Sequence, residues 1–326
     1  MKVIVTGGTG FLGLRLGRQL LGRKHLTLSN GQTAPIDSLV LADTVLPSAR
    51  YDWMDGRVQL TQLEITDREA ISRLIDRDDT SVFHLASIVS AQAEADLDLA
   101  LKVNIEGGRA VLDALRARGG QRFVTTSSYA VFGGELPPVC GDQTKLMPQS
   151  TYGMTKAVLE LLVNDYTRRG LIDGRTARLP TVIIRPGAAN AAASSVASAV
   201  FRDLLKGLDY TVPVSLETRM AVGGVRTVIE GLIALHEADG VQLGGDRAVT
   251  FPSTSYSIAE MIGSLKRVAR GRHLGSITVK PDAVVQAMVS SWPTSIDSSR
   301  AASIGIPAPD DLDSVIRAYI DEFVVV

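Results

Sequence analysis

Short apolar runs rich in β-branched residues alternate with stretches of helical periodicity over the first half of the chain. The runs predicted to be strands are Lys2–Thr6, Ser38–Ala42, Val58–Leu63, Val82–Leu85, Arg122–Ser127 and Val182–Arg185. The stretches predicted to be helices are Leu12–Leu21, Arg68–Asp76, Leu97–Arg118 and Tyr152–Arg168. This alternation predicts an α/β fold with a Rossmann-type doubly wound parallel sheet. Such sheets bind their ligands at the carboxyl ends of the strands.

Beyond Arg185 the pattern is less regular, which predicts a smaller C-terminal substrate-binding lobe. A chain of 326 residues is long enough for one large α/β unit with such a lobe. The predicted division gives the Rossmann domain residues 1–185 with 219–249 returning to it, the lobe 186–218 and 250–299, and a C-terminal helix 300–326.

A glycine-rich turn directly follows the first predicted strand. Gly7, Gly10 and Gly13 are spaced three apart and open an amphipathic helix. In a dinucleotide-binding turn, such glycines permit the sharp bend, let a pyrophosphate approach the backbone, and let helix and strand pack closely. The free N–H groups at the helix start attract phosphate charge. We therefore expect these glycines, with Phe11 and Leu12, to bind a dinucleotide; a plain glycine-rich hairpin is the alternative.

An acidic residue, Asp43, follows the second predicted strand of the sheet. A carboxylate at this place can accept hydrogen bonds from both ribose hydroxyls, and it repels the additional phosphate of NADP. The interval from the glycines is longer than usual, because the polar segment Lys24–Ile36 is predicted to be an excursion between helix and strand. Asp43 therefore predicts NAD as the cofactor, with a solvated loop aspartate as the alternative.

Tyr152 and Lys156 are four residues apart, which places them on one face of a helix. Oxidation of a secondary alcohol needs a base for its proton, and the usual pKa of tyrosine, near 10, is too high for that task. A neighbouring ammonium stabilises the phenolate and lowers this pKa. Ser128, at the end of a hydroxyl-rich strand, can orient the substrate oxygen. The three residues predict an alcohol dehydrogenase centre; an unrelated surface helix pair is the alternative.

Composition excludes several other classes of protein. A net charge of −1 gives no bulk attraction to nucleic acid or to an acidic membrane. The single cysteine, Cys140, cannot form an intrachain disulfide, and no apolar stretch reaches the length of about 18 residues that spans a bilayer. His25, His84, His236 and His273 lack metal-ligand spacing, so no metal is expected. A cytoplasmic enzyme acting on a small molecule is predicted.

The motifs together resemble the extended short-chain dehydrogenase/reductase superfamily, known also as the NAD-dependent epimerase/dehydratase family, over nearly the whole chain. The matching stretches are Thr6–Gly13, His84–Ser87, Asn104, Thr126–Ser128, Tyr152–Lys156 and Arg185–Gly187. The resemblance implies that Tyr152 is the base, that Lys156 holds the ribose and lowers the tyrosine pKa, and that Ser128, or Ser127 one place earlier, polarises the substrate oxygen. It also implies cofactor-binding positions at Glu64, Ile65, Leu85, Ala86, Asn104 and Pro186.

Two places depart from the pattern of that superfamily. Glu64 stands where relatives often carry an aspartate near the adenine. Tyr129 and Ala130 stand where the dehydratases carry Asp-Glu, which argues against sugar dehydration.

One subgroup, the D-erythronate dehydrogenases, resembles the chain in longer strings. These strings are His84–Asp96, Val131–Gly134, Leu161–Tyr166, Asn190–Ser195 and Glu217–Arg219. The resemblance implies that D-erythronate is oxidised at C2 to 2-dehydro-D-erythronate, with NAD taking the hydride. A nucleotide-sugar 4-epimerase of the same superfamily is the alternative, and a non-catalytic NAD-sensing protein is disfavoured because the tyrosine and the lysine are both present.

A hydroxy-acid substrate needs a cation for its carboxylate and small polar groups for its hydroxyls. Ser90, Asn190 and Ser194 are the predicted polar contacts, together with Ser128 and Tyr152, and Arg219 is the predicted carboxylate ligand, with Arg226 as its competitor. Gln92 could face the nicotinamide. His84 and Trp292 are interpreted as packing residues. The predicted helices Leu97–Arg118 and Tyr152–Arg168 form a dimer bundle in many relatives, so a homodimer is expected.

Overall fold

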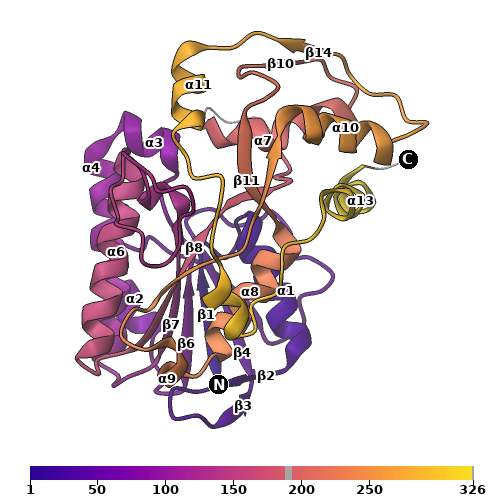
Figure 1. Ribbon diagram of the computed structural model, residues 1–326. Coiled ribbons are helices and arrows are strands. Elements are labelled where there is room, and N and C mark those ends of the chain that lie inside the picture. Colours follow the sequence, from indigo (N-terminus) through magenta and orange to yellow (C-terminus); the bar gives the residue numbers. More distant parts are fainter. Residues whose placement is uncertain (188–192, 325–326) are drawn as a thin grey trace.

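The computed structural model describes residues 1–187 and 193–324. Its centre is a seven-stranded parallel sheet with the strand order β12-β8-β7-β6-β1-β4-β5 (Figure 1), which confirms the Rossmann-type doubly wound fold. Because the chain continues from β1 to β4 on one side and to β6 on the other, a ligand crevice is expected at their carboxyl ends. The strands are β1 (Lys2–Thr6), β4 (Ser38–Asp43), β5 (Val58–Gln62), β6 (Thr80–His84), β7 (Arg122–Ser128), β8 (Asp173–Leu179) and β12 (Ala248–Thr250).

Helices cover both faces of this sheet (Figure 1). Alternate residues of β1 point to opposite faces of the sheet. Val3 and Val5 pack under the helices α1 and α8 on one face, whereas Ile4 packs under α2, α5 and α6 on the other. The helices of this domain are α1 (Phe11–Arg23), α2 (Arg68–Leu74), α3 (Ser90–Ala95), α4 (Leu97–Ala100), α5 (Gly108–Arg116), α6 (Thr151–Arg168), α8 (Val225–Glu237), α9 (Gly240–Leu243) and α12 (Ser299–Ser303). None of the helices in the described part of the chain is both long and apolar enough to cross a membrane.

The strand β8 is the largest departure from the predicted elements. The sequence predicts Val182–Arg185 as the sixth strand, but β8 ends at Leu179, and the following strand β9 (Thr181–Ile183) belongs to a smaller sheet. Arg175 and Arg178 in β8 are only 0% and 3% exposed. A strand with two buried arginines has no apolar run, so hydrophobic patterning does not reveal it.

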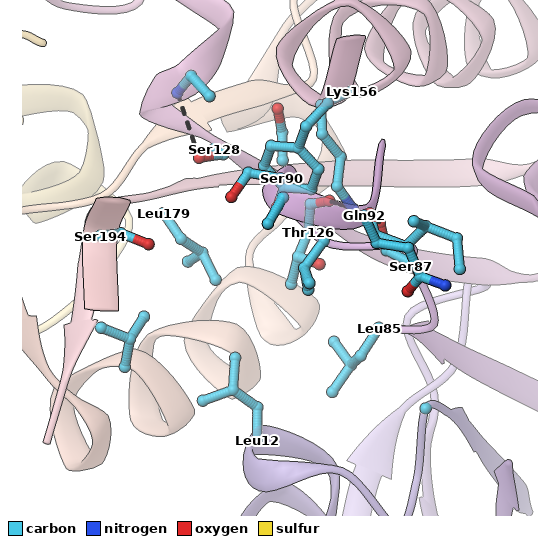
Figure 2. A pocket seen from close by; sticks show the side chains of 18 of the residues that line it. Leu12, Leu85, Ser87, Ser90, Gln92, Thr126, Ser128, Lys156, Leu179 and Ser194 are labelled. Atoms are coloured by element: carbon cyan, nitrogen blue, oxygen red, sulfur yellow. Dashed lines mark hydrogen bonds between the residues drawn. The ribbon is translucent and has the colours of Figure 1, made fainter. Parts of the chain in front are cut away.

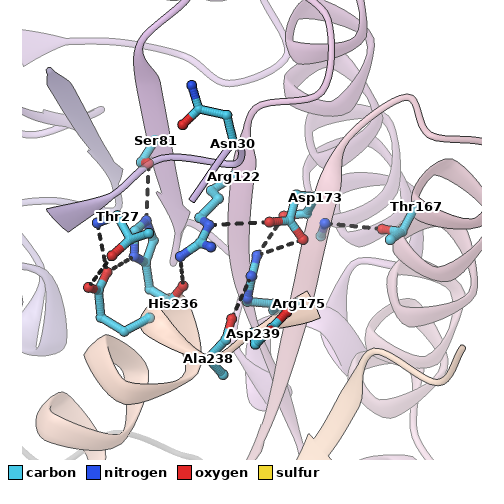
Figure 3. Close-up of polar contacts among 12 residues, drawn as sticks. Thr27, Asn30, Ser81, Arg122, Thr167, Asp173, Arg175, His236, Ala238 and Asp239 are labelled. Atoms are coloured by element: carbon cyan, nitrogen blue, oxygen red, sulfur yellow. Dashed lines mark hydrogen bonds and ion pairs between the residues drawn. The ribbon is translucent and has the colours of Figure 1, made fainter. Parts of the chain in front are cut away.

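The buried charge of Arg175 is balanced by a carboxylate at the start of its own strand and by a backbone oxygen from a distant segment (Figure 3). Arg175 lies 2.9 Å from the carboxylate of Asp173 and donates a hydrogen bond of 2.9 Å to the backbone oxygen of Ala238. Arg122 of β7 pairs with the same carboxylate at 3.2 Å and donates to the backbone oxygen of His236. Breaking a buried ion pair of this kind costs about 3–5 kcal/mol. The strand is therefore stable in the sheet only together with these partners.

A smaller lobe stands over the carboxyl ends of the strands (Figure 1). It contains a three-stranded sheet, β13-β11-β9, and a two-stranded sheet, β10-β14. The segment 219–249 was expected to return to the Rossmann domain, but its first part, β11, pairs in the lobe, and only α8 and the residues after it reach the large sheet. The lobe is built from β9, α7 (Val196–Leu205), β10 (Tyr210–Val212), β11 (Arg219–Gly224), β13 (Thr254–Ser257), α10 (Ile258–Val268), β14 (Ile277–Val279), α11 (Ala283–Ser290) and α13 (Leu312–Phe323).

Two predicted segments have more internal structure than the sequence suggests. The polar excursion after α1 forms a hairpin of β2 (His25–Thr27) and β3 (Thr33–Pro35). The single helix predicted over Leu97–Arg118 is divided, because a π-helical turn, Leu101–Gly107, separates α4 from α5. Such wide turns occur frequently at functional sites.

Candidate active site

A cavity of about 960 Å³ lies between the carboxyl edge of the sheet and the lobe. Its walls come from loops after several strands of the sheet and from α11 near the end of the chain. The sequence-predicted site residues that line it are Gly7, Gly10, Phe11, Leu12, Gly13, Asp43, Glu64, Ile65, Leu85, Ala86, Ser90, Ser128, Tyr152, Lys156 and Ser194.

The glycine turn forms a cradle that side chains would fill. Gly7 has a φ of +68°, and a Cβ there would lie 2.8 Å from the backbone nitrogen of Ala86. A Cβ on Gly13 would lie 2.2 Å from the oxygen of Gly7, so the helix and the turn touch. Gly10 differs, because a Cβ there would meet a single protein atom within 4 Å while the residue faces the cavity. The cradle therefore fits a pyrophosphate at the N-terminus of α1.

The end of β4 supplies the carboxylate expected to meet the ribose. Asp43 accepts hydrogen bonds from the backbone N–H of Thr9 (3.2 Å) and of Thr44 (2.8 Å), which aims its carboxylate beside the glycine turn. Lys156 and Arg185 are the lysine and arginine side chains that line the cavity within the described ranges, and both lie near Tyr152. NADP needs a cation for its additional phosphate, so this arrangement fits NAD.

The predicted catalytic residues come from the end of β7 and the start of α6. Figure 2 shows two of them, Ser128 and Lys156, at the cavity. The hydroxyl of Ser150 caps α6 by accepting a hydrogen bond from the N–H of Gly153 (3.1 Å), so Tyr152 sits in the first turn. The ammonium of Lys156 lies 5.5 Å from the centre of the Tyr152 ring and donates to the backbone oxygen of Thr126 (2.9 Å). The hydroxyl of Ser128 accepts a hydrogen bond from the backbone N–H of Ala130 (3.2 Å), and its presence beside Tyr152 lowers the pKa of the tyrosine. This favours Ser128 over its neighbour as the residue that orients the substrate.

Burial perturbs both titrating groups of this centre. It raises the pKa of Tyr152 to about 12, against the hydrogen bond from Ser128 and the positive charge of Arg185. Burial also lowers the pKa of Lys156 to about 8, while the negative charge of Glu160 opposes the fall. The resemblance implied that Lys156 lowers the pKa of Tyr152. In the structure, the groups that lower this pKa against the effect of burial are Ser128 and Arg185.

Of the two arginines, Arg185 and not Arg219 lines the cavity. Arg185 lines the cavity, and its charge acts on Tyr152. Arg219 does not line this cavity; its side chain is 47% exposed and pairs with Glu260 at 3.1 Å. The difference arises because β11, which begins at Arg219, directs that residue toward the paired strand β13. Asn190 lies outside the residues that the structure describes.

Two side chains from the lobe were not predicted to contact a ligand. Met288 and Trp292, from α11 and the turn after it, line the cavity near the end that also contains Ser194. Trp292 was interpreted as packing, and it does pack against the apolar core of the lobe, but it also faces the cavity. No local motif marks these residues, because only the tertiary fold of the lobe places α11 and the turn after it at the cavity.

Other residues predicted to lie in the site do not line the cavity but hold its walls in place. Asn104, in the π-helical turn, accepts from the N–H of Ile88 (2.7 Å), donates to its oxygen (3.1 Å), and donates to the hydroxyl of Thr155 (3.0 Å). It was predicted as a cofactor contact, but it does not line the cavity and instead joins the loop after β6 to α6; Pro186 does not line the cavity either. His84 is buried and hydrogen-bonded to Thr6.

The groups that line the cavity are those that a dinucleotide needs. Across residues 1–187 and 193–324, His, Cys, Asp and Glu side chains do not gather in groups of three or more that could hold a metal ion. The glycine cradle, the Asp43 carboxylate and the group of Tyr152, Lys156 and Ser128 fit NAD.

The fold and the site define an NAD-dependent enzyme of the epimerase/dehydratase type. The model of the NAD dependent epimerase/dehydratase family matches residues 3–246, and the chain belongs to this family.

Over 323 residues the chain is 44% identical to D-erythronate dehydrogenase of Cupriavidus necator, covering 99% of this chain and 98% of that protein. It is 37% identical to D-erythronate dehydrogenase of Haemophilus influenzae over 322 residues, covering 98% and 99% of the two chains. Among solved structures, the nucleoside-diphosphate-sugar epimerase from Agrobacterium tumefaciens is similar, with a TM-score of 0.89 and 31% identity over 99% of this chain and 94% of that one.

Proposed function

We propose that this protein oxidises D-erythronate at C2 to 2-dehydro-D-erythronate, with NAD as the hydride acceptor. One observation carries the proposal: Tyr152, Ser128 and Arg185 line the same cavity, and Ser128 and the charge of Arg185 both act on the tyrosine. These groups suit the two neighbouring functions of a 2-hydroxy acid, its alcohol and its carboxylate. The full-length identity to two D-erythronate dehydrogenases supports the choice of acid.

The residues divide the work of the oxidation. The hydroxyl of Ser128 hydrogen-bonds the C2 oxygen and orients it toward Tyr152. The phenolate of Tyr152 takes the proton of the C2 hydroxyl as the C2–H bond breaks and the C2=O bond forms. Lys156 keeps a positive charge beside the tyrosine ring and binds the ribose hydroxyls. Bound NAD supplies the site that accepts the hydride.

The substrate contacts follow from the wall of the cavity. Arg185 binds the carboxylate through two parallel hydrogen bonds. Ser90 and Gln92 of α3 and Ser194 before α7 face the cavity (Figure 2) and bind the remaining hydroxyls. We therefore assign the carboxylate to Arg185 in place of Arg219.

The test is the near-ultraviolet absorbance of NADH after purified protein is mixed with NAD and each free tetronate stereoisomer. D-Erythronate is expected to give the fastest NADH formation, with little reduction of NADP. Absence of NADH with every free hydroxy acid would contradict the proposed substrate.

A nucleotide-sugar 4-epimerase is the second candidate. Phe132 and Trp292 line the cavity and offer aromatic faces on which a nucleotide base could stack. The Agrobacterium tumefaciens epimerase, at 31% identity, also favours this class. An epimerase regenerates its cofactor in each turnover, so interconversion of UDP-glucose and UDP-galactose without net NADH would support it.

A cytoplasmic homodimer remains the proposed state of the enzyme. Leu97 of α4 and Leu161 of α6 are 51% and 63% exposed, and these two helices contact each other. A two-fold partner on this face would cover both leucines. Light scattering coupled to gel filtration should give twice the chain mass, and Leu161→Glu should give the monomer.

A further inference from the structure

The buried face of α6 carries a row of functional groups that extends beyond the catalytic pair. Tyr152, Lys156 and Glu160 follow one another at four-residue spacing, so they lie along one side of the helix. Lys156 and Glu160 are 3% and 2% exposed. A buried carboxylate thus stands one helical turn behind the catalytic lysine.

Arg178 of β8 holds this carboxylate in place. Its Nε lies 3.1 Å from each oxygen of Glu160, and its Nη2 lies 2.8 Å from one of them. On its other side the guanidinium donates to the backbone oxygen of Asp142 (3.0 Å) and packs on the ring of Phe132 at 5.5 Å. Arginine keeps its charge throughout the physiological pH range, so the pair stays ionic.

We propose that Glu160 is a positioning residue for catalysis: fixed by Arg178, its carboxylate keeps the buried Lys156 protonated at neutral pH, so that the lysine can bind the cofactor ribose beside Tyr152. The inference rests on the proposed function only in giving Lys156 this role toward NAD.

The surroundings of the lysine explain why it needs a negative neighbour. Burial lowers the pKa of Lys156 to about 8, and Glu160 opposes that fall. The groups around Lys156 and Tyr152 are Thr126 of β7, whose oxygen accepts from the ammonium; His84 of β6; Arg178 behind Glu160; and Arg185 beside the tyrosine. Burial, followed by the charge of Lys156, lowers the pKa of His84 to about 3, so His84 is neutral and adds no second cation. Glu160 is the acidic group whose charge raises the lysine pKa.

The sign of the effect gives a test that needs no substrate. Without the carboxylate, the pKa of the lysine falls further, so the lysine loses its proton at a lower pH. In Glu160→Gln, NAD affinity should match that of the unaltered protein within about threefold near pH 6, where the lysine is charged in both. Near pH 8 it should be about tenfold weaker or more, because only the variant lysine is then fully neutral. Calorimetric titration with NAD across this pH range measures both values.

Matched variants separate this role from mere structural support. The double variant Glu160→Gln/Arg178→Gln leaves no unpaired buried arginine, so it serves if the single variant fails to fold. It should show the same change in the pH dependence of NAD affinity. Glu160→Asp keeps the charge and should restore the profile. Asp173→Asn breaks a buried pair five residues earlier in β8 and should lower the melting temperature without changing the pH profile.

A loss of NAD affinity by the same factor at every pH, or no loss in either glutamine variant, would overturn the inference. Failure of the unaltered protein to oxidise any hydroxy acid would instead count against the proposed function and leave the NAD titrations interpretable.

Discussion

Acidification should destabilise this protein through a histidine beneath its active site. His84 is fully buried, and its Nδ1 lies 2.7 Å from the hydroxyl of Thr6. Burial is the main cause that lowers its pKa from 6.5 to about 3. A histidine with a depressed pKa contributes stability that is present above its unfolded value and is lost as the pH falls toward the folded value. The loss therefore begins near pH 6.5 and continues to about pH 3.

The magnitude follows from the two pKa values. Near pH 5 the unfolded chain has taken up the proton and the folded chain has not, a difference of about 1.5 pH units or about 2 kcal/mol in the free energy of unfolding. Urea unfolding, followed by circular dichroism near pH 7 and near pH 5, measures this free energy.

A variant comparison isolates the contribution of this histidine. His84→Gln cannot titrate but can keep a hydrogen bond to Thr6. Between the two pH values, its free energy of unfolding should therefore fall by about 2 kcal/mol less than that of the unaltered protein. The exposed His25→Gln serves as the control and should behave as the unaltered protein does. Equal losses in His84→Gln and the unaltered protein would refute the assignment.

Three further predictions concern the catalytic cavity. Tyr152→Phe should lower kcat by about 10³-fold with NAD affinity nearly unchanged, measured by NADH formation and by NAD titration; a fully active variant would exclude the tyrosine as the base. Asp43→Ser should weaken the binding of NAD by about tenfold and reduce the preference for NAD over NADP, measured as kcat/KM for each cofactor. Arg185→Met should raise KM for the hydroxy acid by about 30-fold or more without a comparable change in NAD affinity, whereas Arg219→Met should leave KM within about twofold.

The sequence predicts those parts of the protein whose structure depends on residues close together in the chain. The glycine cradle and the Tyr152–Lys156 pair depend on spacing within one turn or one helix, so their positions follow from the chain itself. β8 was missed because its buried arginines are stabilised partly by distant groups. Arg178 pairs with Glu160 of α6, and Arg175 donates to the backbone oxygen of Ala238, more than 60 residues further along the chain. Such long-range compensation leaves no periodic signal.

The substrate end of the cavity shows the same limit. Choosing between Arg185 and Arg219 requires the direction of each side chain after the chain enters the lobe, and that direction is set by the pairing of β9, β11 and β13. Trp292 reaches the cavity only because α11 packs in the lobe and the turn after it passes the cavity. The residue type of Trp292 indicated a packing role, and in the structure Trp292 packs and also lines the cavity.

The route of the chain between domain and lobe restricts how this enzyme can be recombined with its relatives. The chain enters the lobe at β9, returns through α8 to β12, and enters the lobe again at β13. It then returns once more at α12 and ends in the lobe with α13. A chimera that exchanged one lobe segment alone would join strands from different parents within the sheet of β9, β11 and β13. Functional exchange of substrate specificity should therefore require residues 181–224, 254–293 and 312–323 to be transferred together, while the glycine turn and α6 remain with the host.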